Sequence, residues 1–153
     1  MTRRLLVIAA TAGIALTLAG CTKPNPGASV STGVGNAAHA EAVCWAAEAD
    51  AVDATTCATD VLSAAIQGAS LPKAQLVAGN TIGISVDPTV ADAGWIPEIN
   101  GQALTQAPLH TVYYRFQYPS LQAVPEQGLV LDIRAMAGQQ TRGFWVFQLT
   151  PAA

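Results

Sequence analysis

Two stretches near the C-terminal end decide the fold: LVLDIR at residues 129–134 and FWVFQL at residues 144–149. In each, large apolar residues recur at every second position, the period of a β-strand with one buried face. We expect the two strands to be antiparallel neighbours whose inward rows pack together. Those rows are Trp145, Phe147 and Leu149 on the last strand and Leu129, Leu131 and Ile133 on the strand before it. Asp132 and Arg134 then face outward, because a slip of one residue would bury them.

The same period extends upstream over three further segments. Residues 81–86 (TIGISV) alternate cleanly, and residues 95–99 run into an Asn-Gly dipeptide at 100–101 that suits a tight hairpin. In residues 112–118 one face carries Val112, Tyr114, Phe116 and Tyr118. Several short strands separated by turns predict a mainly β fold, an antiparallel sandwich or a barrel-like sheet.

The N-terminal half is less decisive. Residues 29–34 have weak strand character, and residues 42–45 look like the returning strand after a turn at 35–36. An alanine-rich helix over residues 37–53 competes evenly with that strand. Residues 54–66 favour a helix, because a threonine can cap its start and apolar residues recur at four-residue spacing. An α+β fold, with N-terminal helices on an antiparallel sheet, is therefore the alternative to a sandwich with one short helix.

The first residues have the layout of an export signal. Two arginines at positions 3–4 precede an apolar run over residues 5–18, which ends in the box Leu18-Ala19-Gly20-Cys21. The run is shorter than the roughly 20 apolar residues that cross a bilayer. This order resembles bacterial lipoprotein precursors. The resemblance implies cleavage before Cys21 and a diacylglycerol on the sulfur of that cysteine.

That resemblance also implies how the chain is divided. Residues 1–20 would be a lipoprotein signal peptide, residues 21–28 a lipidated tether rich in Pro, Gly and Asn, and residues 29–153 a single exported domain. Two acyl chains suffice for stable attachment to a bilayer. The expected location is the cell membrane, on its outer, extracytoplasmic face, with the membrane as the first partner through Cys21.

Charge excludes one class of partner. The seven Lys and Arg residues include the two in the signal, so the part after residue 20 keeps five basic residues against ten acidic ones, a net charge of −5. Proteins that bind phosphate backbones need clustered Lys and Arg. We therefore expect no nucleic acid, and a remaining partner that is an envelope protein or a small ligand.

Two cysteines, Cys44 and Cys57, remain once Cys21 is lipidated. An even pair in an exported domain predicts a disulfide, which would stabilise the fold by about 3 kcal/mol on the chain-entropy model. A zinc site would need both thiolates together with His39 and His110, but the sequence has no closely spaced ligand pair. We expect no metal and no cofactor.

Signals for catalysis are weak. Residues 33–38 (GVGNAA) match a dinucleotide fingerprint in letters only, and no Gly-x-Ser-x-Gly elbow is present. The acidic side chains Glu48, Asp50 and Asp53 are interpreted as a solvated loop, since they lack the periodicity of a calcium loop. Four aromatic residues could stack on a sugar, but alternation assigns most of them to the core: Trp95, Tyr113, Tyr118 and Trp145. We assign no catalytic residue.

The layout further resembles a group of small uncharacterised actinobacterial envelope lipoproteins, through the cysteine pair, residues 90–95 (VADAGW) and residues 142–147 (RGFWVF). That resemblance implies an immunoglobulin-like sandwich and carries no catalytic residue. The leading hypothesis is a membrane-anchored, non-enzymatic binding or scaffolding domain of the cell envelope. The alternative is an envelope hydrolase with an unrecognised carboxylate site, which would show converged carboxylates with perturbed pKa values.

Overall fold

The computed structural model describes residues 24–35, 37–47, 51–53, 57, 59 and 71–152. The expected signal peptide and Cys21 lie outside them. The strands in chain order are β1 (Gly27–Ser31), β2 (Ala38–Glu41), β3 (Cys44–Trp45), β4 (Lys73–Leu76), β5 (Thr81–Val86), β6 (Trp95–Ile99), β7 (Gln102–Ala103), β8 (Tyr113–Gln117), β9 (Leu129–Ala137) and β10 (Gln140–Pro151). A short helix, α2 (Pro88–Ala93), connects β5 to β6. Within these residues no helix is long and apolar enough to cross a membrane.

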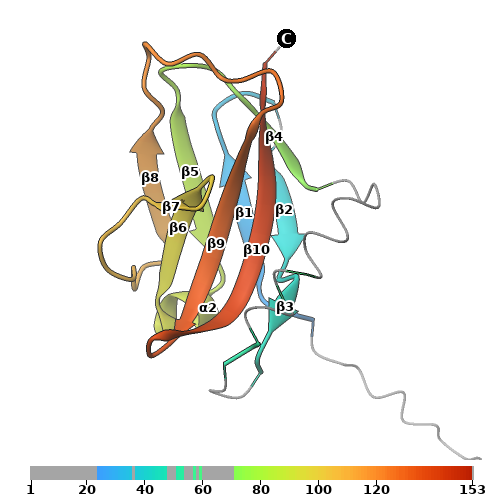
Figure 1. Cartoon of the computed structure of the whole chain (residues 1–153), viewed down its shortest axis with the longest axis vertical. Coiled ribbons are helices and arrows are strands. Elements are labelled where there is room, and N and C mark those ends of the chain that lie inside the picture. Colours follow the sequence, from blue (N-terminus) through green and yellow to red (C-terminus); the bar gives the residue numbers. More distant parts are fainter. Residues whose placement is uncertain are drawn as a thin grey trace, which may run out of the picture.

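The strands form two sheets that face each other as layers (Figure 1). One has four strands in the order β2-β1-β5-β8, and the other has six, in the order β3-β10-β9-β6-β7 with β4 also paired to β10. Every pairing is antiparallel except that of β4 with β10. The molecule is therefore mainly β with one short described helix, as the sequence predicts.

The core lies between the layers and begins with the two strands that open the sequence argument. In the register of β9 and β10, Trp145 is opposite Ile133, Phe147 opposite Leu131 and Leu149 opposite Leu129. All six side chains are buried. The four-stranded sheet covers them with its own inward row, Val30, Ile82 and Ile84. The predicted pairing and facing of these two strands are confirmed.

Both buried tryptophans find acceptors for their indole N–H groups. Trp145 donates to the carbonyl of Pro26 at 3.0 Å, and Trp95 donates to the carbonyl of Thr111 at 2.8 Å. A buried donor without a partner costs free energy, so these two bonds let large aromatic side chains sit wholly inside the sandwich. They also fix the start of β1 and the segment before β8 against the six-stranded sheet.

The region around residues 37–53 corrects two expectations. The helix over these residues is wrong, because β2 and β3 lie within the range, and of the strand expected at 42–45 only Cys44 and Trp45 are in a strand. β2 pairs with β1, whereas β3 pairs with β10 in the other sheet. Between them the amide of Ala42 donates to Pro26, and the next amide, of Val43, donates to Phe144. The chain changes sheets at this point, so the strand that returns beside β1 is β2, which lies before the expected range, and residues 42–43 belong to neither strand.

Other boundaries also differ from expectation. β1 begins at Gly27, so Gly27 and Ala28, placed in the tether by the sequence, belong to the sheet. The helix expected at 54–66 lies outside the described residues apart from Cys57 and Thr59, which are helical. The short helix α2 was not predicted, although Pro88 fits its first turn and Gly94, at φ 86°, ends it.

β4 was also missed. It pairs parallel to the end of β10, and its inward residues Ala74 and Leu76 are buried. Val112, expected on the inward face of a strand, precedes β8 and is 51% exposed. The Asn-Gly hairpin is confirmed: Asn100 and Gly101 both have positive φ, 48° and 77°, as a two-residue turn between β6 and β7 requires.

Candidate binding site

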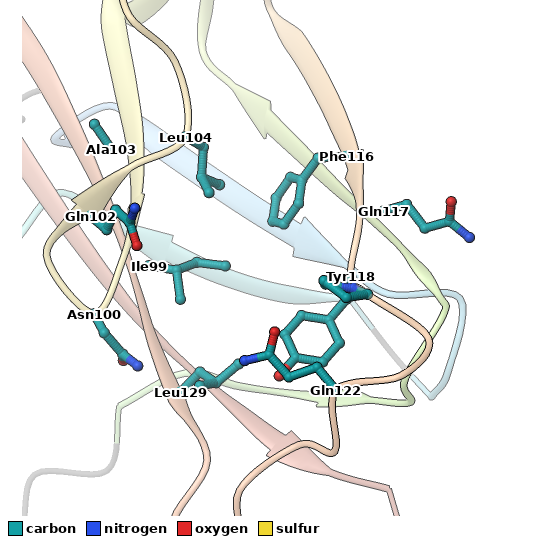
Figure 2. Close-up of a pocket in the computed structure, with 11 residues that line it drawn as sticks. Ile99, Asn100, Gln102, Ala103, Leu104, Phe116, Gln117, Tyr118, Gln122 and Leu129 are labelled. Atoms are coloured by element: carbon teal, nitrogen blue, oxygen red, sulfur yellow. The ribbon is translucent and has the colours of Figure 1, made fainter.

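A hollow of about 530 Å³ opens where the β6–β7 hairpin and the segment after β8 approach each other (Figure 2). Its residues come from both sheets and from the loop that connects β8 to β9. They are Ile99, Asn100, Gln102, Ala103, Leu104, Phe116, Gln117, Tyr118, Pro119, Gln122 and Leu129. β7 and β8 end the orders of their respective sheets, so the hollow is the open side of the sandwich.

Local sequence explains each wall. The turn at Asn100 returns the chain as β7, and the amide of Leu104 bonds back to the carbonyl of Pro97. On the other wall Pro119 ends the strand, because proline cannot continue the backbone ladder. The hydroxyl of Tyr118 then donates to the carbonyl of Ala123 at 3.3 Å, which holds the following loop against the opening.

The lining combines apolar surface with amide groups. Ile99, Leu104 and Phe116 point toward one another across the hollow, while the side chain of Gln117 points away from it (Figure 2). That side chain donates to the carbonyl of Gly79 at 3.0 Å, so Gln117 presents its backbone to the hollow. No Asp, Glu, Lys, Arg or His is among the lining residues. The chemistry fits an uncharged ligand with apolar groups and hydrogen-bonding groups.

A carboxyl pair lies elsewhere, across two strands of the six-stranded sheet. Glu98 of β6 is directly opposite Asp132 of β9. Burial, which has the larger effect, and the nearby charge of Glu98 together raise the pKa of Asp132 to about 6. Arg134 donates from Nη2 to Oε1 of Glu98 at 2.5 Å. Neither carboxyl group lines the hollow of Figure 2, so the two features are separate.

The predicted disulfide joins Cys44 and Cys57. Their Cα atoms are 6.0 Å apart, a separation that a disulfide spans readily. A zinc site built on these two thiolates is therefore excluded, because bonded sulfurs are not thiolates. Among the described residues no three His, Cys, Asp or Glu side chains gather as metal ligands do.

The histidines lie apart. His39 is opposite Ser29 on the exposed face of the four-stranded sheet, with 2.9 Å between Nδ1 and the hydroxyl oxygen. His110 packs against Gly94, where a Cβ would come within 2.8 Å of its ring. Glu48 and Asp50 of the acidic loop lie outside the described residues, and Asp53 is exposed. Gly33 and Gly35 occupy a bend at positive φ, which suits turn glycines rather than a nucleotide loop.

The four aromatic residues do not form a stacking platform. Trp95, Tyr118 and Trp145 are buried, whereas Tyr113 is half exposed. Trp95 packs edge-on against Tyr114 with ring centroids 6.3 Å apart. The expectation that most of these rings belong to the core is confirmed.

The hollow was not predicted from the sequence. The signal of its residues is weak because amide side chains beside a turn, such as Asn100 and Gln102, are also what an ordinary exposed hairpin contains. The second wall, near Gln117, is more than a dozen residues away in the chain. The hollow forms because the ends of the two sheets, β7 and β8, lie close to each other in the folded protein.

Comparison of the chain with protein-family models, with curated proteins and with solved structures gives no significant match.

Proposed function

We propose that this protein is a bacterial lipoprotein, anchored through Cys21 on the outer face of the cell membrane, whose domain binds an uncharged ligand without catalysing a reaction. The observation that carries the binding role is the lining of the hollow, which offers apolar groups, amide groups and the ring of Tyr118, but no Asp, Glu, Lys, Arg or His. The box at residues 18–21 supports the anchor. A disulfide suits the oxidising exterior that this location implies.

The position of the hollow fits such an anchor. The first residue of the first strand, Gly27, lies at the end of the four-stranded sheet where β5 finishes, since Ala28 pairs with Val86. The hollow lies at the other end, where Gln117 pairs with Thr81. Cys21 is three residue steps from Pro24, at most about 11 Å of extended chain. A lipid on Cys21 would hold the end of the domain near Gly27 close to the membrane, with the hollow at the opposite end.

The anchor is tested by Cys21→Ala in cells fed labelled palmitate. The wild-type chain is expected to incorporate label and to partition with membranes, and the variant to incorporate none. The label is decisive, because an uncleaved apolar segment would retain the variant in the membrane fraction without lipid. Palmitate on the Cys21→Ala chain would contradict the proposal. A matched control is Thr22→Ala, which leaves the cysteine in place.

A second candidate function is hydrolysis at the Glu98–Asp132 pair. The raised pKa of Asp132 favours it, because a carboxyl group that keeps its proton near pH 6 can act as a general acid. Release of soluble fragments from isolated bacterial cell walls would measure this activity. Hydrolysis that disappears in Asp132→Asn, with the variant still folded, would replace the binding role by an enzymatic one.

A further inference from the structure

The outer edge of β8 has hydrogen-bonding groups that the sheet does not use. The amide of Val86 donates to the carbonyl of Val112, and the amide of Tyr118 donates to that of Asn80. In an antiparallel ladder every second residue bonds to the neighbouring strand. With the register of β5 and β8, the residues that bond inward are therefore the even-numbered ones. The amides and carbonyls of Arg115 and Gln117 point away from the sheet.

No described residue takes up those groups. The described backbone bonds include none to the amides or carbonyls of Arg115 and Gln117 from the open side. At Tyr113 the carbonyl accepts the hydroxyl of Thr111 at 2.8 Å, so the free stretch of edge begins after that residue. It ends at Pro119, whose ring nitrogen carries no hydrogen. The available edge is short, and it leads directly into the hollow, which Phe116 and Gln117 line.

The facing wall, formed by the β6–β7 hairpin, also has backbone groups that point away from the paired strand. The amide of Leu104 donates to the carbonyl of Pro97, so in this register Ile99 and Gln102, which are opposite each other, also lie at a bonded position of the ladder. Ala103 lies between Gln102 and Leu104, and its amide and carbonyl therefore point to the outside of the hairpin. Apolar side chains, those of Ile99 and Leu104, fill the space toward Phe116 (Figure 2). The hollow thus has an apolar floor beside an unused strand edge.

We propose that the hollow binds an extended peptide segment of another protein, which adds to the edge of β8 and places uncharged, apolar side chains between Phe116 and Leu104. This inference rests on the proposed binding role and names its partner class. A strand supplies alternating amides and carbonyls that match those of Arg115 and Gln117, and every second side chain enters the hollow. A neutral lining selects against charged residues at those positions, since a charge there would lose water without gaining a partner.

The test uses full-length protein and a fluorescent peptide of about seven residues, capped at both ends and alternating Thr with Val. Fluorescence anisotropy measures its dissociation constant. Arg115→Pro removes one outward amide and places a proline ring at the edge, but it removes no bond to β5. We expect it to weaken binding about tenfold or more. The matched control, Arg115→Ala, keeps the amide and loses only the charge, so binding is expected to change less than about twofold.

Modified peptides test the same contact without altering the protein. N-methylation at alternate residues removes donors from one edge of the peptide, and one of the two methylation registers is expected to abolish binding. Replacing Val by Glu is expected to abolish it as well. Binding that survives both N-methylation registers, or is equally strong to Arg115→Pro, would overturn the proposal. So would the absence of any peptide binding, binding of a neutral oligosaccharide in the hollow instead, or a dimer of this chain formed through β8.

These outcomes are independent of the anchor. Missing palmitate on Cys21 would contradict the location and would leave peptide binding measurable, whereas missing peptide binding would leave the lipid label unchanged. Failure of the inference can therefore be told apart from failure of the anchor. Binding of a neutral oligosaccharide without the peptide would reject the inference and keep the binding role, whereas binding of neither would reject both.

Discussion

The two sides of the sandwich differ in what holds them together. On the closed side, β9 and β10 pair along nearly their whole length and bury both of their facing apolar rows. On the open side, β7 has two residues and β8 has five, and the hollow lies between them. The closed side makes the fold stable, while the open side leaves backbone groups for a partner. In this molecule the paired interior strands β9 and β10 therefore hold the fold together, whereas the proposed recognition uses β7 and β8 at the ends of the two sheets.

The largest effect is expected on the closed side. Trp145→Ala removes a fully buried indole and its bond to Pro26, and truncations of this kind cost about 3–5 kcal/mol. That is a large share of the stability of a small domain, so the variant is expected to be mostly unfolded by circular dichroism at 37 °C. A matched change on the open side, Gln122→Ala, is expected to alter stability by less than about 0.5 kcal/mol.

An unchanged melting temperature in Trp145→Ala would remove the distinction between the two sides. If that variant also lost peptide binding, Trp145 would be a ligand-contacting residue and the closed side would take part in recognition.

The closed side is also the part that could be predicted from the sequence. Large apolar side chains, such as those of Trp145 and Phe147, alternate strictly with smaller or polar ones, and only one orientation of the strand buries them. The pairing of the two strands and their inward rows could therefore be predicted from the sequence. The N-terminal half lacks this alternation of large apolar side chains with smaller or polar ones. Ala38 and Ala40 suit a helix or a strand, and only pairing with β1 decides between them. β4 was missed because its inward residues, Ala74 and Leu76, make a pattern too short to stand out.

The candidate site could be predicted only in part. The disulfide followed from counting the cysteines of a chain that is expected to be exported, and it is confirmed. The hollow could not be predicted, because its walls come from the β6–β7 hairpin and from β8, which are not paired with each other. The Glu98–Asp132 pair required the register of β6 with β9. The periodicity of a sequence predicts strands and their buried faces, but it does not predict which unpaired strands lie close together in space.

The disulfide is expected to give the next largest effect. Cys44→Ala and Cys57→Ala should each lower the free energy of unfolding by about 3 kcal/mol, because each removes the same loop constraint. The double variant should lose no more than either single one. Urea unfolding of the three variants measures this, and additive losses would show that the two side chains act separately. Peptide binding by folded Cys44→Ala protein should persist, since neither cysteine lines the hollow.

A smaller effect is expected at the carboxyl pair. The folded-state pKa of Asp132 is raised to about 6 by burial and by Glu98, above its ordinary value of 3.8, so the folded protein holds the proton more tightly than the unfolded chain. The contribution of Asp132 to stability should therefore be greatest below about pH 4, fall as the pH rises from 4 to 6, and level off above. Asp132→Asn should remove this dependence and stabilise the protein at pH 8 by about 1 kcal/mol, allowing for solvent screening.

Thermal unfolding across this pH range measures the effect, with Glu126→Gln as a control on an exposed carboxyl group. If Asp132→Asn lowered stability at pH 8, the ionised carboxylate would be stabilised by the fold, and the hydrolase alternative would lose its main support.

Hydrogen exchange in β8 tests most directly the claim that the open edge is a recognition surface. In the free protein the amides of Tyr114 and Phe116, which bond to β5, should exchange slowly, and those of Arg115 and Gln117 should exchange fast. Addition of the Thr-Val peptide should slow Arg115 and Gln117 and leave the amides of β9 and β10 unchanged. Slow exchange of Arg115 and Gln117 in the free protein, or no change on adding the peptide, would contradict the account.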